Sequence, residues 1–212
     1  MNQGSIDFPA LVLTATVWAY WIAVGAMVLR ARRRTRDLAG LVPQQALERR
    51  MWLVWVPLVG AWMTLPWLAQ TRARAPWAIP PSVWDLPSYG LLRWFAAVVA
   101  VACLVLTAKC WMRMGTDWRM AVSEDQKSPL ITDGLFARVR HPIYALSILL
   151  MLMTAIIVPT PLMIAIAAVH ICLMVLKARN EERHLLKMHG DDYARYLRQT
   201  GRFVPRLSVK AA

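Results

Sequence analysis

Five apolar runs constrain this chain more than any other feature of its sequence. Three of them, residues 11–29, 51–69 and 91–108, approach the roughly 20 residues that a helix needs to cross a hydrocarbon core about 30 Å thick. Two shorter runs, 143–158 and 162–176, are joined by the segment "IVPTPL", whose two prolines favour a tight turn. We therefore predict an all-α integral membrane protein with five transmembrane helices.

The distribution of basic residues predicts how these helices are oriented. The chain has 212 residues and a formal net charge of +13, yet 58% of its residues are hydrophobic, a combination typical of membrane proteins. If the amino terminus lies outside, the segments 30–50, 109–142 and 177–212 face the cytoplasm and hold 22 of the 25 Lys and Arg residues. Because basic residues concentrate in cytoplasmic loops, we expect this topology.

Several classes of function find no support in the sequence. The basic residues sort by membrane side without a zinc-finger or basic-zipper pattern, so we do not expect nucleic-acid binding. The spacing of Cys and His predicts no metal site, and no dinucleotide-binding, P-loop or nucleophile-elbow motif is present. Without a dedicated nucleophile, the chain favours a reaction in which the protein positions two bound partners, as in methyl transfer from a sulfonium donor.

The last two apolar runs bring distant polar segments together. A hairpin of two spans returns the chain to the side it left, so the "RVRHP" and "KARNEER" clusters at its two ends are expected to be neighbours. We therefore predict a single membrane domain over 1–212, in which 109–142 and 177–212 form one cytoplasmic region that contains the chemistry.

The cluster before the fourth run suits the binding of an anion. Pro142 follows His141 and fits the first position of a helix, where the following backbone N–H groups are free and the helix dipole favours negative charge. Tyr144, three residues after His141, falls on the same helical face. The alternative is that Arg138, Arg140 and His141 only anchor the helix at the cytoplasmic surface.

The cluster after the fifth run contains a pair of acids. Glu181 and Glu182 lie about one turn past the span, where a charge is costly unless it is matched or used. Lys177 can pair with Glu181 four residues later, whereas Arg179 points to another face of the helix. A structural network of ion pairs is the alternative to a functional site.

The remaining histidines and the tryptophans are predicted to be structural. We expect His170 to be a core residue of the fifth span, and His184 and His189 to lie on the surface of a tail made of two short amphipathic helices joined at Gly190. The tryptophans near the spans fit membrane interfaces and packing, although some could line a tunnel for an apolar substrate. They are Trp18, Trp21, Trp52, Trp55, Trp62, Trp67, Trp94 and Trp111.

Over its carboxyl-terminal 45% the chain resembles the integral-membrane isoprenylcysteine carboxyl methyltransferases, which are related to phospholipid N-methyltransferases. The resemblance runs through "MGTDWRMAV" (114–122), "SPLITDGLFARVRHPIY" (128–144) and "KARNEERHLLKMHGDDYARYL" (177–197). It depends on the combination of R-H-P-x-Y, a short hairpin with prolines, and an E-E pair followed by G-x-x-Y.

The resemblance implies an enzyme that methylates a lipophilic acceptor with S-adenosylmethionine, which would bind on the cytoplasmic face of a bacterial inner membrane without a Rossmann domain. Lys177 occupies the place near the acceptor where the family usually has Arg. Our own interpretation is that Lys177 and Arg179 would fix a carboxylate acceptor, whereas an amine acceptor would need Glu182 as a base. The residues expected around the cofactor are Ser128, Pro129, Leu130, Ile131, Phe136, Arg140, His141, Pro142, Ile143, Tyr144 and Glu181.

Three residues depart from the family pattern and leave alternatives open. Phe136 stands where the family commonly has Tyr, Ser128 where His is frequent, and Lys177 where Arg is usual. Carboxyl methylation of an isoprenylcysteine-like substrate is the expected activity. The alternatives are a phospholipid N-methyltransferase, a small-thiol S-methyltransferase, a relative of the larger membrane sterol reductases, and a scaffold of the same fold without activity.

Overall fold

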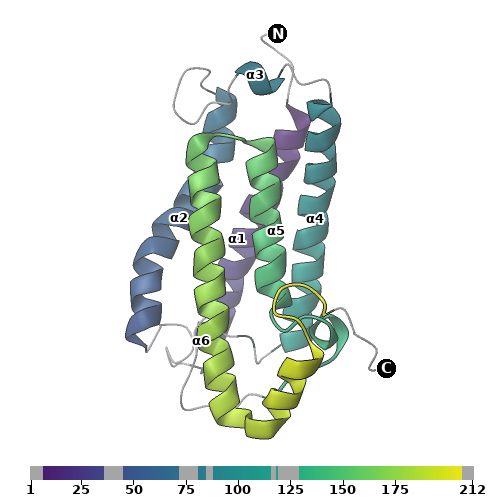
Figure 1. Cartoon of the computed structure of the whole chain (residues 1–212). Helices are drawn as coiled ribbons and strands as arrows, with labels where there is room; N and C mark the ends of the chain where they lie inside the picture. The colour runs from purple at the N-terminus through teal and green to yellow at the C-terminus, as the bar shows by residue number, and fades with distance from the viewer. Residues whose placement is uncertain are drawn as a thin grey trace, which may run out of the picture.

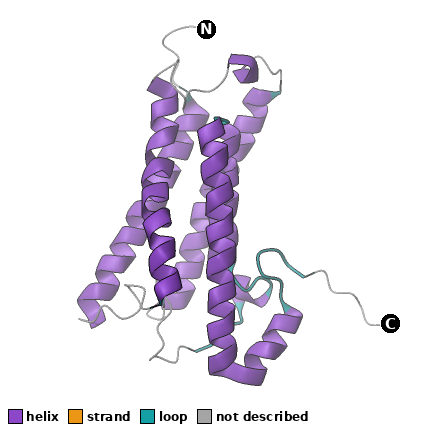
Figure 2. Cartoon of the chain, turned by 60° about the vertical axis from the view of Figure 1, so that its left-hand side comes forward, coloured by secondary structure: helices purple, strands orange, loops and turns teal. Residues whose placement is uncertain are grey.

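The fold is a bundle of long helices (Figure 1). The computed structural model describes residues 7–35, 45–71, 81–84, 88–115, 118 and 129–206. Its helices are α1 (Phe8–Thr35), α2 (Ala46–Thr71), α3 (Pro81–Trp84), α4 (Tyr89–Met114), the 3-10 helix η2 (Gly134–Ala137), α5 (Pro142–Ile157) and α6 (Pro161–Gln199). Within the described part of the chain there is no strand, only one isolated bridge (Figure 2). The all-α prediction is confirmed.

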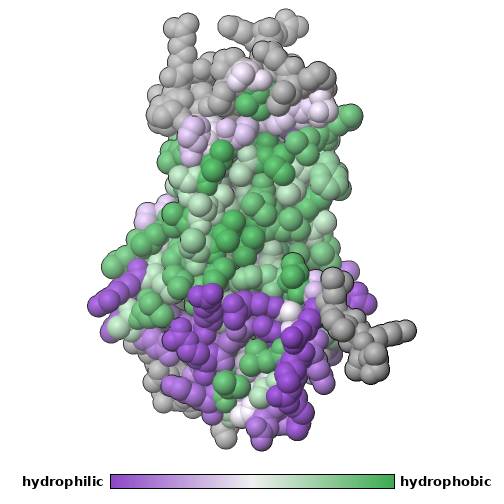
Figure 3. Space-filling model, viewed as in Figure 1, coloured by the Kyte–Doolittle hydropathy of each residue, from purple (hydrophilic) through white to green (hydrophobic). Residues whose placement is uncertain are grey.

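The long helices have the length and composition of membrane spans. Among the described residues α1, α2, α4 and α6 are long and apolar enough to cross a bilayer. The 16 residues of α5 give a helix about 24 Å long, shorter than a hydrocarbon core of about 30 Å. On the face shown in Figure 3, an apolar band covers the middle of the bundle, and hydrophilic residues gather at its lower end. The protein is an integral membrane protein whose five long helices fit the five predicted spans.

Prolines and a threonine cap form the turn between α5 and α6. Pro159 lies in the turn, and Pro161 is at the first position of α6, where its missing N–H costs nothing. The Thr160 hydroxyl caps the helix by accepting a hydrogen bond of 3.1 Å from the N–H of Met163. This is the proline hairpin expected from the sequence.

The carboxyl-terminal tail differs from the prediction of two separate short helices. α6 continues without interruption from its apolar part, which ends at Leu176, into the polar segment beyond it. It bends at Gly190, whose φ of 50° and ψ of −123° suit glycine and strain other residues. The predicted glycine joint is present, but the helix before it is the extension of the fifth span. This bend turns the end of α6 back toward α5 (Figure 1).

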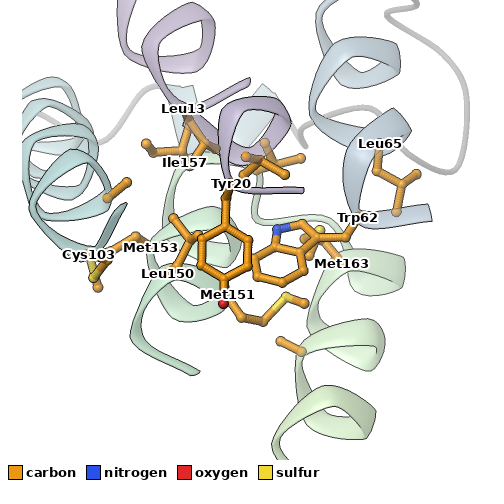
Figure 4. Close-up of a cluster of buried hydrophobic side chains, with 14 of the residues drawn as sticks. Leu13, Tyr20, Trp62, Leu65, Cys103, Leu150, Met151, Met153, Ile157 and Met163 are labelled. Atoms are coloured by element: carbon orange, nitrogen blue, oxygen red, sulfur yellow. The ribbon is translucent and has the colours of Figure 1, made fainter. Parts of the chain in front are cut away.

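The core contains residues from all five long helices, α1, α2, α4, α5 and α6. Small side chains on α4, those of Ala96, Ala97 and Ala100, are almost completely buried and allow close packing against neighbouring helices. Trp62 of α2 and Tyr20 of α1 belong to the same buried cluster (Figure 4). Its indole N–H donates a hydrogen bond of 2.9 Å to Thr154 of α5, so its polar atom is satisfied within the apolar core.

Candidate functional site

The loop before α5 is paired with the end of the chain. Residues 200–203, here called the C-terminal strap, run parallel to residues 138–141. The N–H of Arg140 donates to the carbonyl of Gly201 at 2.8 Å, and the N–H of His141 donates to that of Arg202 at 3.1 Å. A third bond of 3.3 Å returns from the N–H of Gly201 to the carbonyl of Arg138. Because Arg140 also donates a hydrogen bond to Glu182, the two ends of the predicted hairpin are neighbours.

Glu182 holds the strap and the loop together. Its carboxylate accepts a hydrogen bond of 3.0 Å from Arg140 Nε and one of 2.6 Å from Arg202 Nη2. His141 Nε2 lies 3.4 Å from the same carboxylate. Burial acts to raise the pKa of Glu182, but hydrogen bonds from His141, Arg202 and Arg140 outweigh it and hold the pKa well below its usual range.

His141 lies between Glu182 and Glu181, the other acid of the pair. Its Nδ1 atom lies 3.5 Å from Glu181, which also accepts a hydrogen bond from the Tyr144 hydroxyl. The rings of His141 and Tyr144 are parallel, with centroids 5.4 Å apart, as expected for two residues on one helical face. Burial acts to lower the pKa of His141, but contacts with Glu181 and Glu182 outweigh it and raise the pKa.

A cavity of about 280 Å³ opens beside these residues. One end is charged and polar, and it is lined by His141, Tyr144, Lys177, Glu181, His184 and His189. The other end is aromatic and lies among the membrane-spanning helices. Its lining includes Tyr20, Trp21, Trp55 and Trp111, and Trp118 also lines the cavity. At the charged end, the ammonium nitrogen of Lys177 lies 6.0 Å from the centroid of the Tyr144 ring.

The structure brings most of the predicted site residues to this one cavity. Ser128 lies outside the described residues. The predicted residues that line the cavity are Pro129, Leu130, Ile131, Phe136, Arg140, His141, Pro142, Ile143, Tyr144, Lys177 and Glu181. Arg179 and Glu182 do not line the cavity. Arg179 is exposed on another face of α6, and Glu182 is buried outside the cavity, where Arg140 and Arg202 contact it.

The positions of His184 and His189 differ from the prediction. His184 and His189 were expected on the surface of the tail, but both are partly buried and line the cavity, because the bend at Gly190 folds the end of α6 over them. Tyr196, beyond the bend, donates a hydrogen bond of 2.5 Å to the carbonyl of Phe136 and fixes the tail on the loop before α5. His170, in contrast, is fully buried as predicted.

Other residues of the site carried no clear signal in the sequence. Tyr20, Trp21 and Trp55 come from the first two spans, where one aromatic residue among many cannot be assigned to a cavity. Arg202 contacts Glu182, which lies 20 residues earlier in the chain. The basic residue is visible in the sequence, but its partner depends on the bend of α6.

Comparison with known proteins identifies a related family over part of the chain. The model of the isoprenylcysteine carboxyl methyltransferase (ICMT) family matches residues 88–187, which include α4, the loop before α5, α5 and most of α6. No protein with a curated description matches the chain at significant similarity. The resemblance noted in the sequence is confirmed: residues 88–187 match the model of the isoprenylcysteine carboxyl methyltransferase family.

Proposed function

We propose that the protein is an S-adenosylmethionine-dependent membrane methyltransferase that acts on a lipophilic acceptor by carboxyl methylation of an isoprenylcysteine-like substrate. One observation carries the proposal: a single cavity joins a charged end to an aromatic end among the membrane-spanning helices. Such a cavity suits two different ligands, one polar and one apolar, whose reactive atoms meet where the two ends join.

The charged end fits the groups of S-adenosylmethionine. When bound, this cofactor supplies a methyl group activated by its sulfonium. Glu181 would hold a cationic part of the cofactor. The first hydrogen bond of α5 runs from the N–H of Ala145 to the carbonyl of His141, so the N–H groups of Ile143 and Tyr144 lie before it and would hold the carboxylate of the cofactor. Two further atoms, His189 Nε2 and Tyr193 Oη, are buried without a partner among the described residues and favour a polar ligand there.

The arrangement favours an acceptor that is already a nucleophile. Lys177 is placed to hold a carboxylate, which needs no base; the protein then contributes orientation and exclusion of water. Glu182 is poorly suited as the base that an amine would need, since its carboxylate is engaged by Arg140 and Arg202 and its pKa is low. We assign Glu182 a positioning role and give Arg179 no part in the reaction.

We also propose that the cavity opens on the cytoplasmic face. The loop before α5 and the polar part of α6 are the segments in which the basic residues concentrate, and the hydrophilic lower end of Figure 3 is the same end of the bundle. The donor is hydrophilic and does not cross membranes, so in sealed vesicles only those with the cytoplasmic face outward should methylate an added acceptor.

Titration of the purified protein with S-adenosylhomocysteine, the demethylated cofactor, tests the proposal. We expect calorimetric binding by the wild type and a loss of at least about tenfold in affinity for Glu181→Ala, because a charged hydrogen-bonding partner is removed. Arg179→Ala is the matched control, since it removes an exposed charge from the same helix two residues earlier and should leave affinity unchanged.

Two outcomes would overturn the assignment. A wild-type protein that does not bind S-adenosylhomocysteine would indicate a scaffold without activity. If binding occurs, transfer of a labelled methyl group identifies the acceptor class: a base-labile methyl ester supports carboxyl methylation, whereas a methylated amine or a thioether would contradict it.

A further inference from the structure

A chain of polar side chains lies at the inner end of the cavity. It consists of Tyr20 from α1, Ser147 from α5 and His170 from α6, which are 4%, 4% and 0% exposed. Ser147 Oγ lies 3.1 Å from His170 Nε2, and the Tyr20 hydroxyl is near enough to Ser147 to interact with it. Tyr20 and Ser147 line the cavity, with His170 behind them. Polar groups at this depth are costly unless they are paired or used.

The surroundings of His170 define the direction of the hydrogen bonds. A neutral imidazole has one N–H donor and one acceptor nitrogen. The Nδ1 atom of His170 is buried without a partner among the described residues, and the His170 and Trp62 rings form a T-shaped pair with centroids 5.1 Å apart. A proton on Nδ1 would leave a buried donor unmatched, so we assign the proton to Nε2, which then donates to Ser147. The O–H of Ser147 is then available to donate to Tyr20, which would leave the Tyr20 O–H to donate into the cavity.

We propose that Tyr20, oriented by Ser147 and His170, is a specificity-determining residue of the acceptor site, whose hydroxyl donates to an unprotonated head group such as a carboxylate or thiolate. This inference rests on the function proposed above and adds a residue from α1, outside the segment that matches the family. An ammonium head group has no lone pair to accept from Tyr20, and Lys177 in the same cavity would repel it. Trp21, Trp55 and Trp111 would contact the apolar part of the acceptor.

Two matched probes test this role in the full-length protein. S-farnesylthioacetate carries a carboxylate and S-farnesylcysteamine carries an ammonium on the same apolar tail. Their affinities are measured by quenching of tryptophan fluorescence in protein saturated with S-adenosylhomocysteine. We expect the wild type to prefer the carboxylate. Tyr20→Phe should weaken carboxylate binding by about tenfold, as is typical for losing a hydrogen bond to a charged group, without changing binding of the amine.

Variants of His170 separate positioning from packing. His170→Leu removes the donor to Ser147 and should weaken carboxylate binding as Tyr20→Phe does, whereas His170→Gln, whose amide can donate from a similar position, should restore it. Affinity for S-adenosylhomocysteine reports whether each variant is folded. If the Tyr20→Phe variant does not bind S-adenosylhomocysteine, the Ser147→Ala variant is used in its place. Equal affinity of the wild type for the two probes, or an unchanged preference in Tyr20→Phe, would overturn the inference. Failure of the wild type to bind S-adenosylhomocysteine would instead overturn the proposed function.

Discussion

The two adjacent acids of α6 have different surroundings and therefore different roles. Glu182 is buried and accepts hydrogen bonds from Arg140 and Arg202, so its charge is matched. Glu181 faces the cavity, where it contacts His141 and Tyr144 and can still meet a ligand. One carboxylate thus supports the site, and its neighbour is available for binding. His141 lies between the two and couples them electrostatically.

This coupling predicts a dependence of stability on pH. His141 has a raised pKa, so its contribution is complete below its ordinary pKa of 6.5 and is lost as the pH rises through the raised value. Glu182 has a lowered pKa, so its contribution is complete above its ordinary pKa of 4.5 and is lost only as the pH falls through the lowered value. The loop and strap should be held most firmly between these limits.

Thermal unfolding measured against pH checks this prediction. We expect the wild-type midpoint to fall as the pH rises above the raised pKa of His141, while His141→Gln, which cannot titrate, should lack that part of the decrease. The difference between the two profiles isolates His141 from the other titrating groups. Parallel profiles across the alkaline range would show that the charge of His141 does not stabilise the fold.

At the scale of elements, the strap closes the site by packing against the loop before α5. Gly201 makes this possible, because a Cβ atom there would lie 1.7 Å from the carbonyl oxygen of Val204 and 3.0 Å from its carbonyl carbon. These are backbone atoms and cannot move aside as a flexible side chain would. Space at this position, rather than an unusual φ, therefore requires glycine.

Gly201→Ala is expected to detach the strap. The hydrogen bonds with Arg138 and Arg140 would break, and the free energy of unfolding should fall by more than about 1 kcal/mol, with weaker binding of S-adenosylhomocysteine. Gly60→Ala is the matched control: it lies within α2 with no atom close to the added Cβ, and should be neutral or stabilising by about 0.5–1 kcal/mol. Chemical denaturation of both variants gives the comparison; equal stability would show that the strap does not need this close approach.

The sequence predicted the elements better than it predicted how they are tied together. Pro142 and Pro161 mark the starts of α5 and α6, because a proline at a first helical position is a local signal. The pairing of Val139 with Gly201 joins residues far apart in the chain and leaves no local pattern. The positions of His184 and His189 were predicted wrongly for the same reason, since their burial depends on the bend at Gly190.

At the scale of the whole molecule, the bundle places a polar cap against one end of an apolar body. α5 has only 16 residues and is the shortest of the five long helices, so the loop before it begins within the depth that a full span would cover. The polar part of α6 extends past that depth and bends back, and the strap completes the closure (Figure 1). The cavity lies at this junction, where a hydrophilic donor and a lipophilic acceptor can both arrive.

The central claim is that the loop before α5, the polar part of α6 and the strap close over one cofactor. A structure determined with S-adenosylhomocysteine tests it most directly. We expect the ligand to contact residues of the 129–144 segment together with Glu181 and Tyr193, on the side of the cavity away from Trp21 and Trp55. Ligand bound elsewhere on the protein, with this cavity empty at saturating concentration, would contradict the account.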